Sequence, residues 1–206
     1  MTQAAGTATT GAEREERRLV EGCRRGDFDC FERLMGRYEK KIYNLALRML
    51  RDPDDARDIL QETFLKVYDN LEKFRGEAHL STWIYRIAMN EALMRIRKDK
   101  RRPRSIDTFT EEDGETRGLD VEDWKPLPLE RALTHELGGR LDRAVARLPA
   151  DYRGPFLLRD VEGLSNEEIA KVMKLSVPAV KSRIHRARVS LRAELSKYLA
   201  KGRRDN

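Results

Sequence analysis

The sequence predicts an all-α protein made of two small helical domains joined by a flexible acidic linker. Apolar residues recur at spacings of three and four, whereas no stretch alternates strictly between apolar and polar residues as a half-buried strand does. Charged residues make up 38% of the 206 residues, against roughly 25% in an ordinary globular domain. This high charge favours two small cores over a single large one, because small domains have more surface per core residue.

Shifts in composition divide the chain into five segments. We expect a disordered tail at residues 1–12, a first domain at 13–104, the acidic linker at 105–129, a second domain at 130–200 and a basic tail at 201–206. Between residues 105 and 137, ten acidic residues stand against three basic ones, and no helical periodicity runs through the first part. Such a composition is typical of an extended segment, with helix resuming near residue 130.

The first domain opens with an amphipathic helical stripe. Its apolar members are Leu34, Met35, Tyr38, Ile42, Leu45, Ala46 and Met49. A break follows, after which Asp52 is placed to cap the next helix and Pro53 suits its first position. The apolar side of that helix carries Ile59, Leu60, Phe64, Val67, Tyr68 and Leu71. A third helix is predicted from about Ser81, with Leu80, Trp83, Ile84, Ile87 and Ala88 facing inward.

The second domain contains two helix starts about eleven residues apart. At the first, Ser165 can cap the helix and Glu168 can complete a capping box. At the second, Ser176 can cap, and Pro178 falls in the first turn, where proline is tolerated. Only Lys174 to Ser176 lie between the two helices, so the pattern predicts a helix-turn-helix.

The second of these helices has a buried face and a polar face. Residues Val180, Ile184, Ala187, Leu191 and Leu195 cluster in one narrow arc, whereas Pro178, Ser182, His185 and Arg186 project from the opposite side and Lys181, Arg183 and Arg188 lie on the flanks. Eleven basic residues stand against four acidic ones from residue 163 onward. Short polar groups flanked by cations are what a recognition helix presents to a major groove, so we expect DNA binding rather than an ordinary solvated helix.

Several classes of protein are not expected. The chain has no apolar run near 18 residues, and its first twelve residues lack the basic start and apolar stretch of a secretion signal. No nucleophile–base pair or phosphate-binding glycine loop points to an enzyme. The three histidines are widely separated, so we expect no metal site and no cofactor.

The two cysteines, Cys23 and Cys30, lie seven residues apart within a helical pattern. On one continuous helix their Cα atoms would be about 10 Å apart, which is too far for a disulfide. We therefore expect two reduced structural cysteines in a cytoplasmic protein.

Two stretches of the chain resemble the sigma-70 family of bacterial RNA polymerase initiation factors, and specifically its extracytoplasmic-function (ECF) group. They are DPDDARDILQETFLKVYDNLEKFRGEAHLSTWIYRIAMNEALMRIRKDKRR at 52–102 and LPADYRGPFLLRDVEGLSNEEIAKVMKLSVPAVKSRIHRARVSLR at 148–192. These look like regions 2 and 4 of the family, in that order. The resemblance implies a subunit that directs core RNA polymerase to promoters, reads the −35 element as duplex and melts the −10 element by capturing a flipped base.

The resemblance also implies where region 2 binds polymerase. The family docks this region on the clamp helices of the largest catalytic subunit, and the matching positions are Asp55, Asp58, Gln61, Glu62 and Phe64. The charge pattern agrees, since six acidic residues face three basic ones between 51 and 69, which suits a protein partner better than DNA.

For the melted −10 element, the resemblance points to the loop that begins at Phe74 and to the helix after it. The candidate residues are Phe74, His79, Ser81, Tyr85, Arg86 and Asn90. Tyr85 and Arg86 are expected to be exposed, whereas Trp83 lies on the apolar stripe and is expected to pack in the core. Residues 91–104 add seven basic residues against two acidic ones, a track for phosphates beside the stacked bases.

For the −35 element, the matching base-contacting positions are Lys181, Ser182, His185 and Arg186, with Arg183 and Arg188 as phosphate contacts. The partners implied are core RNA polymerase, through its clamp helices and flap region, promoter DNA and an anti-sigma factor, with no membrane insertion. The acidic linker resembles segments that thread the RNA exit path as nucleic-acid mimics. Two other interpretations are a stand-alone helix-turn-helix regulator that binds DNA as a dimer and a sigma-like decoy for an anti-sigma factor.

Overall fold

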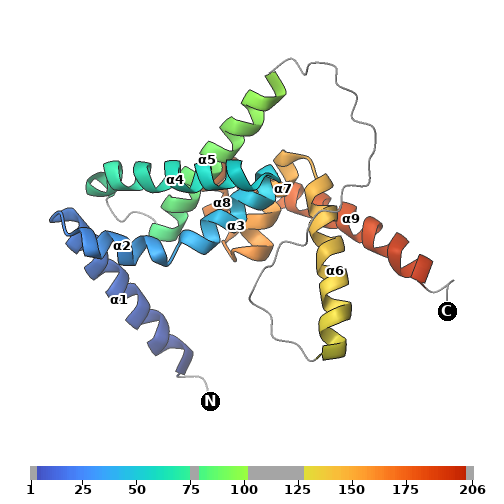
Figure 1. Cartoon of the computed structure of the whole chain (residues 1–206), viewed down its shortest axis with the longest axis horizontal. Coiled ribbons are helices and arrows are strands. Elements are labelled where there is room, and N and C mark those ends of the chain that lie inside the picture. The colour runs from blue at the N-terminus through green and yellow to red at the C-terminus, as the bar shows by residue number, and fades with distance from the viewer. Residues whose placement is uncertain (1–3, 75–78, 102–127, 203–206) are drawn as a thin grey trace.

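The computed structural model describes residues 4–74, 79–101 and 128–202, and throughout this part of the chain the ordered elements are helices without a strand (Figure 1). The all-α prediction is therefore confirmed. Most of the expected linker lies outside the described residues. Within them, no helix is both long enough and apolar enough to cross a membrane.

The N-terminal half, residues 4–101, forms a helical bundle. Its elements are α1 (Ala4–Arg24), α2 (Phe28–Gly36), α3 (Glu39–Leu50), α4 (Pro53–Asn70), the short 3₁₀ helix η1 (Leu71–Lys73) and α5 (Leu80–Arg101). The α4 start follows the prediction, because the Asp52 carboxylate accepts hydrogen bonds from the backbone amides of Asp54 and Asp55 at 2.8 and 2.9 Å. In this half, α4 packs on both α3 and α5.

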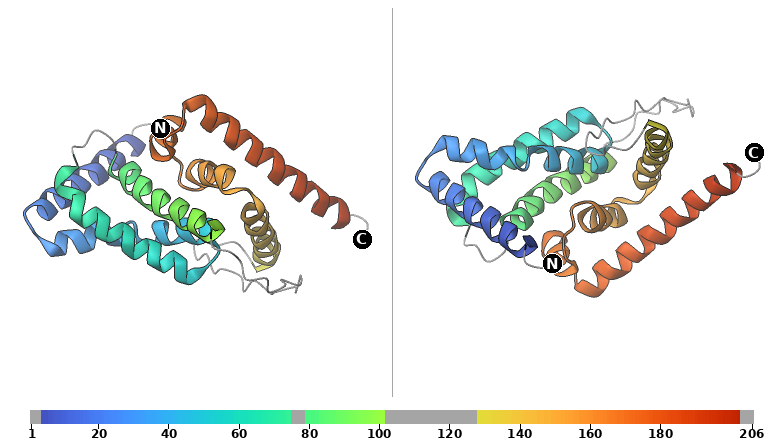
Figure 2. Two further views of the ribbon diagram at one scale, coloured as in Figure 1. Left: turned by 90° about the horizontal axis from the view of Figure 1, so that it is seen from above. Right: turned by 90° about the horizontal axis from the view of Figure 1, so that it is seen from below.

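The C-terminal half, residues 128–202, contains the second group of helices. Its elements are α6 (Pro128–Arg147), α7 (Ala150–Phe156), the π-helical turn η2 (Leu157–Val161), α8 (Asn166–Met173) and α9 (Val177–Gly202). Helix α9 packs on α6, α7 and α8, and its C-terminal end extends away from the N-terminal bundle (Figure 2).

Two predicted boundaries differ from the structure. Helix α1 begins at Ala4, inside the stretch expected to be a disordered tail, where alanines with high helix propensity extend the helix toward the N-terminus. The single stripe from residue 34 to 49 is divided between α2 and α3, because the chain turns at Arg37 and Tyr38. All seven of its predicted apolar members are nevertheless buried.

The two cysteines lie on different helices, and not on the one continuous helix that their spacing allowed. Helix α1 ends at Arg24, Gly26 adopts a φ of 83°, and Asp27 caps α2 by accepting a 3.1 Å hydrogen bond from the Cys30 amide. Cys23 and Cys30 therefore stand on different helices, so the separation expected for one continuous helix does not apply. Both thiols are free, and burial raises the pKa of Cys23 to about 11.

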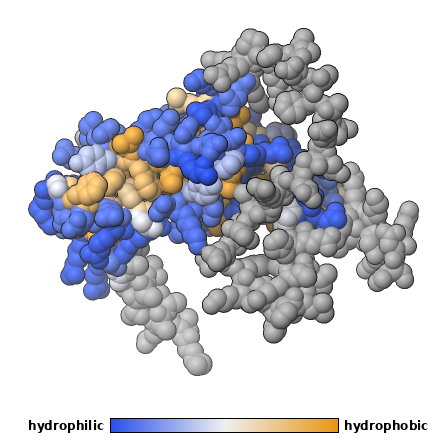
Figure 3. All heavy atoms as spheres, viewed as in Figure 1, coloured by the Kyte–Doolittle hydropathy of each residue, from blue (hydrophilic) through white to orange (hydrophobic). Residues whose placement is uncertain are grey.

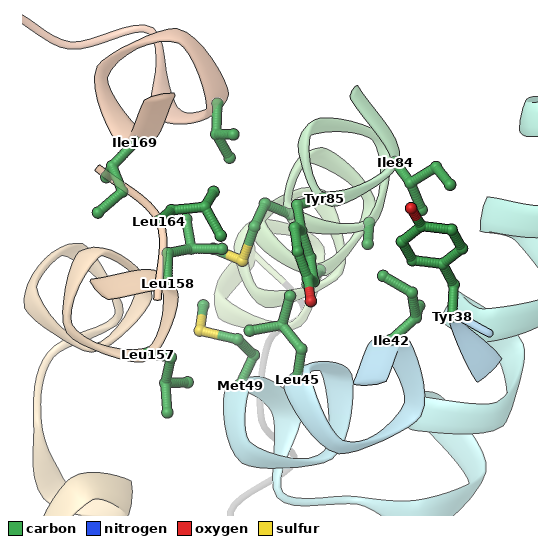
Figure 4. Close-up of a cluster of buried hydrophobic side chains, with 14 of the residues drawn as sticks. Tyr38, Ile42, Leu45, Met49, Ile84, Tyr85, Leu157, Leu158, Leu164 and Ile169 are labelled. Atoms are coloured by element: carbon green, nitrogen blue, oxygen red, sulfur yellow. The ribbon is translucent and has the colours of Figure 1, made fainter. Parts of the chain in front are cut away.

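The two halves share one hydrophobic core instead of forming two separate ones. Leu157, Leu158, Leu164 and Ile169 from the C-terminal half face Met49 and Tyr85 from the N-terminal half (Figure 4). Helix α5 packs directly on α8. A β-carbon at Gly154 would lie 2.8 Å from the Met89 methyl carbon, so the Met89 side chain of α5 reaches α7 at this point.

Candidate nucleic-acid interface

Helices α8 and α9 form the predicted helix-turn-helix. The capping box at α8 is complete, because the Ser165 hydroxyl accepts from the Glu168 amide at 3.1 Å and the Glu168 carboxylate accepts from the Ser165 amide at 2.8 Å. Lys174 ends α8 in the left-handed conformation with a φ of 53°. The Ser176 hydroxyl then accepts from the Ala179 amide at 3.3 Å, which fixes the start of α9.

The two faces of α9 follow the prediction for all but one residue, because Leu195, which was expected on the buried face, is only half-buried. Val180, Ile184, Ala187 and Leu191 are at most 5% exposed and anchor the helix on the C-terminal half. The four candidate base-contacting side chains Lys181, Ser182, His185 and Arg186 are all exposed. The structure therefore gathers these four residues on the outer surface of the second helix of the motif.

Three arginines, one on this face and two on its flanks, contact polar groups of the preceding segments. Arg186 donates to the Tyr152 hydroxyl at 3.3 Å, and Arg183 lies 4.0 Å from Asp151. Arg188 donates through two nitrogens to the Asp160 carboxylate at 2.5 and 3.2 Å, and these hydrogen bonds raise the pKa of its guanidinium. A hollow of about 360 Å³ lies between the start of α7 and α9, and the residues of the first two contacts line it. The pairs hold the cations along the edge of the exposed face.

The candidates for the melted −10 element lie around the start of α5, and they differ in exposure. His79 and Arg86 are exposed, and Ser81 and Asn90 are half-exposed. Phe74 is half-buried. Its ring centroid lies 5.2 Å from that of Trp83, which packs against the core as predicted. Residues 75–78 of the same loop lie outside the described residues.

Tyr85 is the exception, since the prediction that it is exposed is wrong. Its side chain is 3% exposed, and its hydroxyl donates to the Glu162 carboxylate of the C-terminal half. Burial and this carboxylate raise the pKa of Tyr85 well above its ordinary value. Tyr85 belongs to the core that both halves share, so the pattern of α5 alone did not reveal its burial.

The candidates for polymerase binding lie along α4. Asp58, Gln61 and Glu62 are exposed, whereas Phe64 is half-buried against the core. Arg95 of α5 pairs with both Asp55 and Asp58, at 3.3 Å for the latter. Asp55 is thus held inside the α4–α5 contact, and the acidic surface available to a partner is centred on the other three polar residues.

An exposed apolar group beside this acidic surface was not predicted. Leu65 and Tyr68 of α4 are 64% and 56% exposed, and the Phe31 ring of α2 packs edge-on against Tyr68 at 5.1 Å. Apolar atoms gather over α2 and α4 in this view of the surface (Figure 3). Tyr68 was expected on the buried side of α4, and helical spacing alone does not distinguish it from its buried neighbour Leu71.

In the described part of the chain, no group of acidic, cysteine and histidine side chains could hold a metal ion.

Two family models match the two halves of the chain. The model of sigma-70 region 2 matches residues 34–102, and the model of sigma-70 region 4 matches residues 138–191. The RNA polymerase sigma-H factor of Pseudomonas aeruginosa is 36% identical over 189 residues, which cover 90% of this chain and 96% of that protein. The chain belongs to the sigma-70 family.

Further relatives place this sigma factor in the ECF group. The ECF RNA polymerase sigma-E factor of Escherichia coli is 39% identical over 175 residues, which cover 84% of this chain and 90% of that protein. The solved structure of CnrH in complex with the cytosolic domain of CnrY is 25% identical, has a TM-score of 0.63 and covers 89% of this chain and 98% of CnrH. The sigma factor RpoE of Bartonella quintana, solved in complex with the anti-sigma factor NepR, shares the fold at a TM-score of 0.60.

The chain is therefore a DNA-binding transcription initiation factor of the ECF type. Both expected regions occur in the expected order, with region 2 in the N-terminal half and region 4 in the C-terminal half. Such a factor directs RNA polymerase to specific promoters.

Proposed function

We propose that this sigma factor reads the −35 duplex with Lys181, Ser182, His185 and Arg186, and that Arg183 and Arg188 contact the flanking phosphates. The observation that carries this proposal is the exposure of all four side chains on the outer face of α9, directly after a three-residue turn. Arginine and lysine hydrogen-bond well to the acceptor edge of guanine. A serine hydroxyl can donate to or accept from the polar edges of several bases. The opposite face of α9 is buried, so the helix can enter a major groove only in this orientation.

The N-terminal half takes the other two tasks in this proposal. Phe74, His79, Ser81, Arg86 and Asn90 bind the melted −10 strand, with aromatic and cationic groups for stacking and phosphates. Tyr85 joins them only when the C-terminal half moves off α5, since it is buried in the described arrangement.

Core polymerase binds the acidic surface of α4 in this proposal. Asp58, Gln61 and Glu62 are exposed there, with Leu65 and Tyr68 beside them. Exposed apolar side chains rimmed by acidic groups are typical of a protein-binding surface and not of a DNA-binding one. Asp55 and Phe64 support this surface from behind, through Arg95 and the core.

We also propose the limits of the two domains, the cellular location of the protein and a regulatory partner. Residues 13–104 and 130–200 act as the two functional domains, and the acidic segment between them spans the two promoter elements. The protein works in the cytoplasm, where polymerase and chromosome meet, and catalyses no covalent step. An anti-sigma factor is a further expected partner, because the sigma factor RpoE of Bartonella quintana was solved in complex with the anti-sigma factor NepR.

Transcription with purified components tests the proposed function. Adding the full chain to core RNA polymerase should produce promoter-specific transcripts from a mapped promoter of the source organism, whereas core polymerase alone should not. Tight sequence-specific binding of DNA by the protein alone, without any effect on core polymerase, would indicate the stand-alone regulator instead. Binding to an anti-sigma factor with no transcription would indicate the decoy.

A further inference from the structure

Phe74, the first of the candidate residues for the −10 element, is contacted by a side chain that precedes the region 2 match. The Arg24 guanidinium, in the last turn of α1, donates to the backbone carbonyl of Phe74, which lies 50 residues later in the chain. Helix α1 also packs on η1, the 3₁₀ turn that ends immediately before Phe74. The family match begins only at residue 34, so this arginine lies outside it.

The backbone that carries Arg24 is held in place by the turn between α1 and α2. The Gly26 amide donates to the Cys23 carbonyl at 3.0 Å, and the Asp27 amide donates to the Gly22 carbonyl at 3.1 Å. Gly26 has a φ of 83°, which glycine adopts without strain. Because these bonds fix the end of α1, the Arg24 side chain starts from a defined position.

Phe74 is held through three different groups. Its amide donates to the Leu71 carbonyl at 3.1 Å, and its carbonyl accepts from Arg24. Its ring packs against Trp83, with 5.2 Å between the centroids. The Trp83 amide in turn donates to the His79 carbonyl at 3.2 Å. Trp83 therefore joins two of the −10 candidates, Phe74 and His79, to the first turns of α5.

Arg24 makes the one contact of these three that comes from outside the segment between α4 and α5. Phe74 is extended, with φ −69° and ψ 109°, so its carbonyl lies beyond the hydrogen bonds of η1. A guanidinium gives this carbonyl a charged donor, which forms a stronger hydrogen bond than a neutral one does. An aromatic ring that stacks on an unpaired base binds best when its orientation is fixed before the base arrives.

We propose that Arg24 is a positioning residue for capture of the melted −10 strand. It holds the Phe74 backbone, so that the Phe74 ring stays against Trp83 and meets the strand in one orientation. Without this contact, part of the binding free energy is used to order Phe74. The role in promoter recognition rests on the proposed function, whereas the anchoring of Phe74 does not.

Trp83 fluorescence tests the anchoring in the full chain, without polymerase or DNA. In a Trp124→Phe background, Trp83 is the remaining tryptophan. Arg24→Ala should shift its emission to longer wavelength, toward that of Phe74→Ala, because the Phe74 ring no longer covers it. Arg24→Lys keeps a charged donor and should restore the emission. Arg25→Ala, which removes the same charge from the next residue, also exposed, should match the wild type. Far-UV circular dichroism verifies that each variant is folded.

Binding of the holoenzyme to a forked promoter with a single-stranded −10 element tests the role in recognition. Discrimination between the mapped −10 sequence and its single-base substitutions should fall about fivefold in Arg24→Ala, within the range of one hydrogen bond. Arg24→Lys should recover it, and Arg25→Ala should keep it. The dependence of affinity on salt should have the same slope in Arg24→Ala as in the wild type, because a positioning residue contacts no phosphate.

Each other outcome contradicts a defined part of the proposal. Unchanged Trp83 emission in Arg24→Ala would overturn the anchoring of Phe74. Changed emission with intact −10 discrimination would overturn the positioning role. An equal loss of affinity for every −10 sequence, with a salt slope smaller by about 0.7, would show that Arg24 binds a phosphate directly. A wild type that does not discriminate between −10 sequences, while Trp83 responds as expected, would contradict the proposed function and leave the anchoring intact.

Discussion

Arg186 is the residue on which the proposed −35 contact depends most. Its guanidinium is exposed on α9 and is steadied by the Tyr152 hydroxyl at 3.3 Å. Because a bidentate contact with a base edge discriminates by about 1–3 kcal/mol, Arg186→Ala should weaken −35-dependent promoter binding by that amount. Binding of the holoenzyme to promoters with and without an intact −35 element, at stated salt, measures the effect.

The matched control for this substitution is Arg192→Ala. Arg192 is also exposed on α9 but lies more than one turn farther along the helix. Its removal should leave discrimination between −35 sequences unchanged. Loss of core polymerase binding in Arg186→Ala, with sequence discrimination intact, would show that this face of α9 is assigned wrongly.

Glu162 and Glu168 of the C-terminal half accept from Tyr85 and Thr82 of the N-terminal half, and they should give opposite dependences of stability on pH. Burial raises the pKa of Glu162 despite the Tyr85 hydrogen bond. Burial also acts to raise the pKa of Glu168, but hydrogen bonds from the Ser165 amide and hydroxyl and from Thr82 outweigh it and lower this pKa. The folded state therefore binds the Glu162 proton more tightly than the unfolded chain does, and the Glu168 proton less tightly.

Unfolding in urea between pH 7 and pH 3.5 tests these signs. The stability of the wild type relative to Glu162→Gln should rise as the pH falls through the raised pKa of Glu162. Relative to Glu168→Gln it should stay constant above about pH 4.5, near the unfolded-state value, and fall below it. Parallel curves for the two variants would contradict the assigned environments.

At the scale of elements, helix starts were predictable because their signals are local. Asp52 with Pro53, and Ser165 with Glu168, specify α4 and α8 within a few residues of chain, and both caps form. The end of α1 was not predictable, because it depends on the backbone conformation of the turn that follows and not on the apolar pattern. The division between α1 and α2 requires Gly26 at positive φ, and nothing in the apolar spacing indicates it.

Helix α4 offers a test of such a local signal. Asp52→Ala removes the acceptor for two backbone amides and should cost about 1 kcal/mol of stability. For a chain of this size that lowers the melting temperature by about 2–4 °C. Asp69→Ala makes the same change at the other end of the helix, where an acidic residue opposes the helix dipole, and should be neutral or slightly stabilising. Equal losses in both variants would show that the effect is not due to capping.

For the whole molecule, the sequence predicted the fold class and the exposed face of α9, but not how the halves meet. The apolar spacing along α3 and α5 predicts which side chains of these helices are buried. Tyr85, however, is buried by residues some 70 to 80 positions later in the chain. The same holds for Arg153, whose partners are carbonyls of α3. The spacing of apolar residues describes one helix at a time. It therefore cannot predict contacts between segments that are far apart in the sequence.

A shared core makes a final prediction about cooperativity. Leu191 is 5% exposed on α9, which packs on α6, α7 and α8 of its own half. Leu191→Ala should cost about 2–4 kcal/mol. Because the core continues into the N-terminal half, the unfolding midpoint reported by Trp83 fluorescence should fall together with the far-UV signal. A Trp124→Phe background leaves Trp83 as the fluorophore, and Val189→Ala, at a position 51% exposed on the same helix, should leave both midpoints unchanged. A Trp83 midpoint that stays fixed in Leu191→Ala would mean that the halves unfold independently.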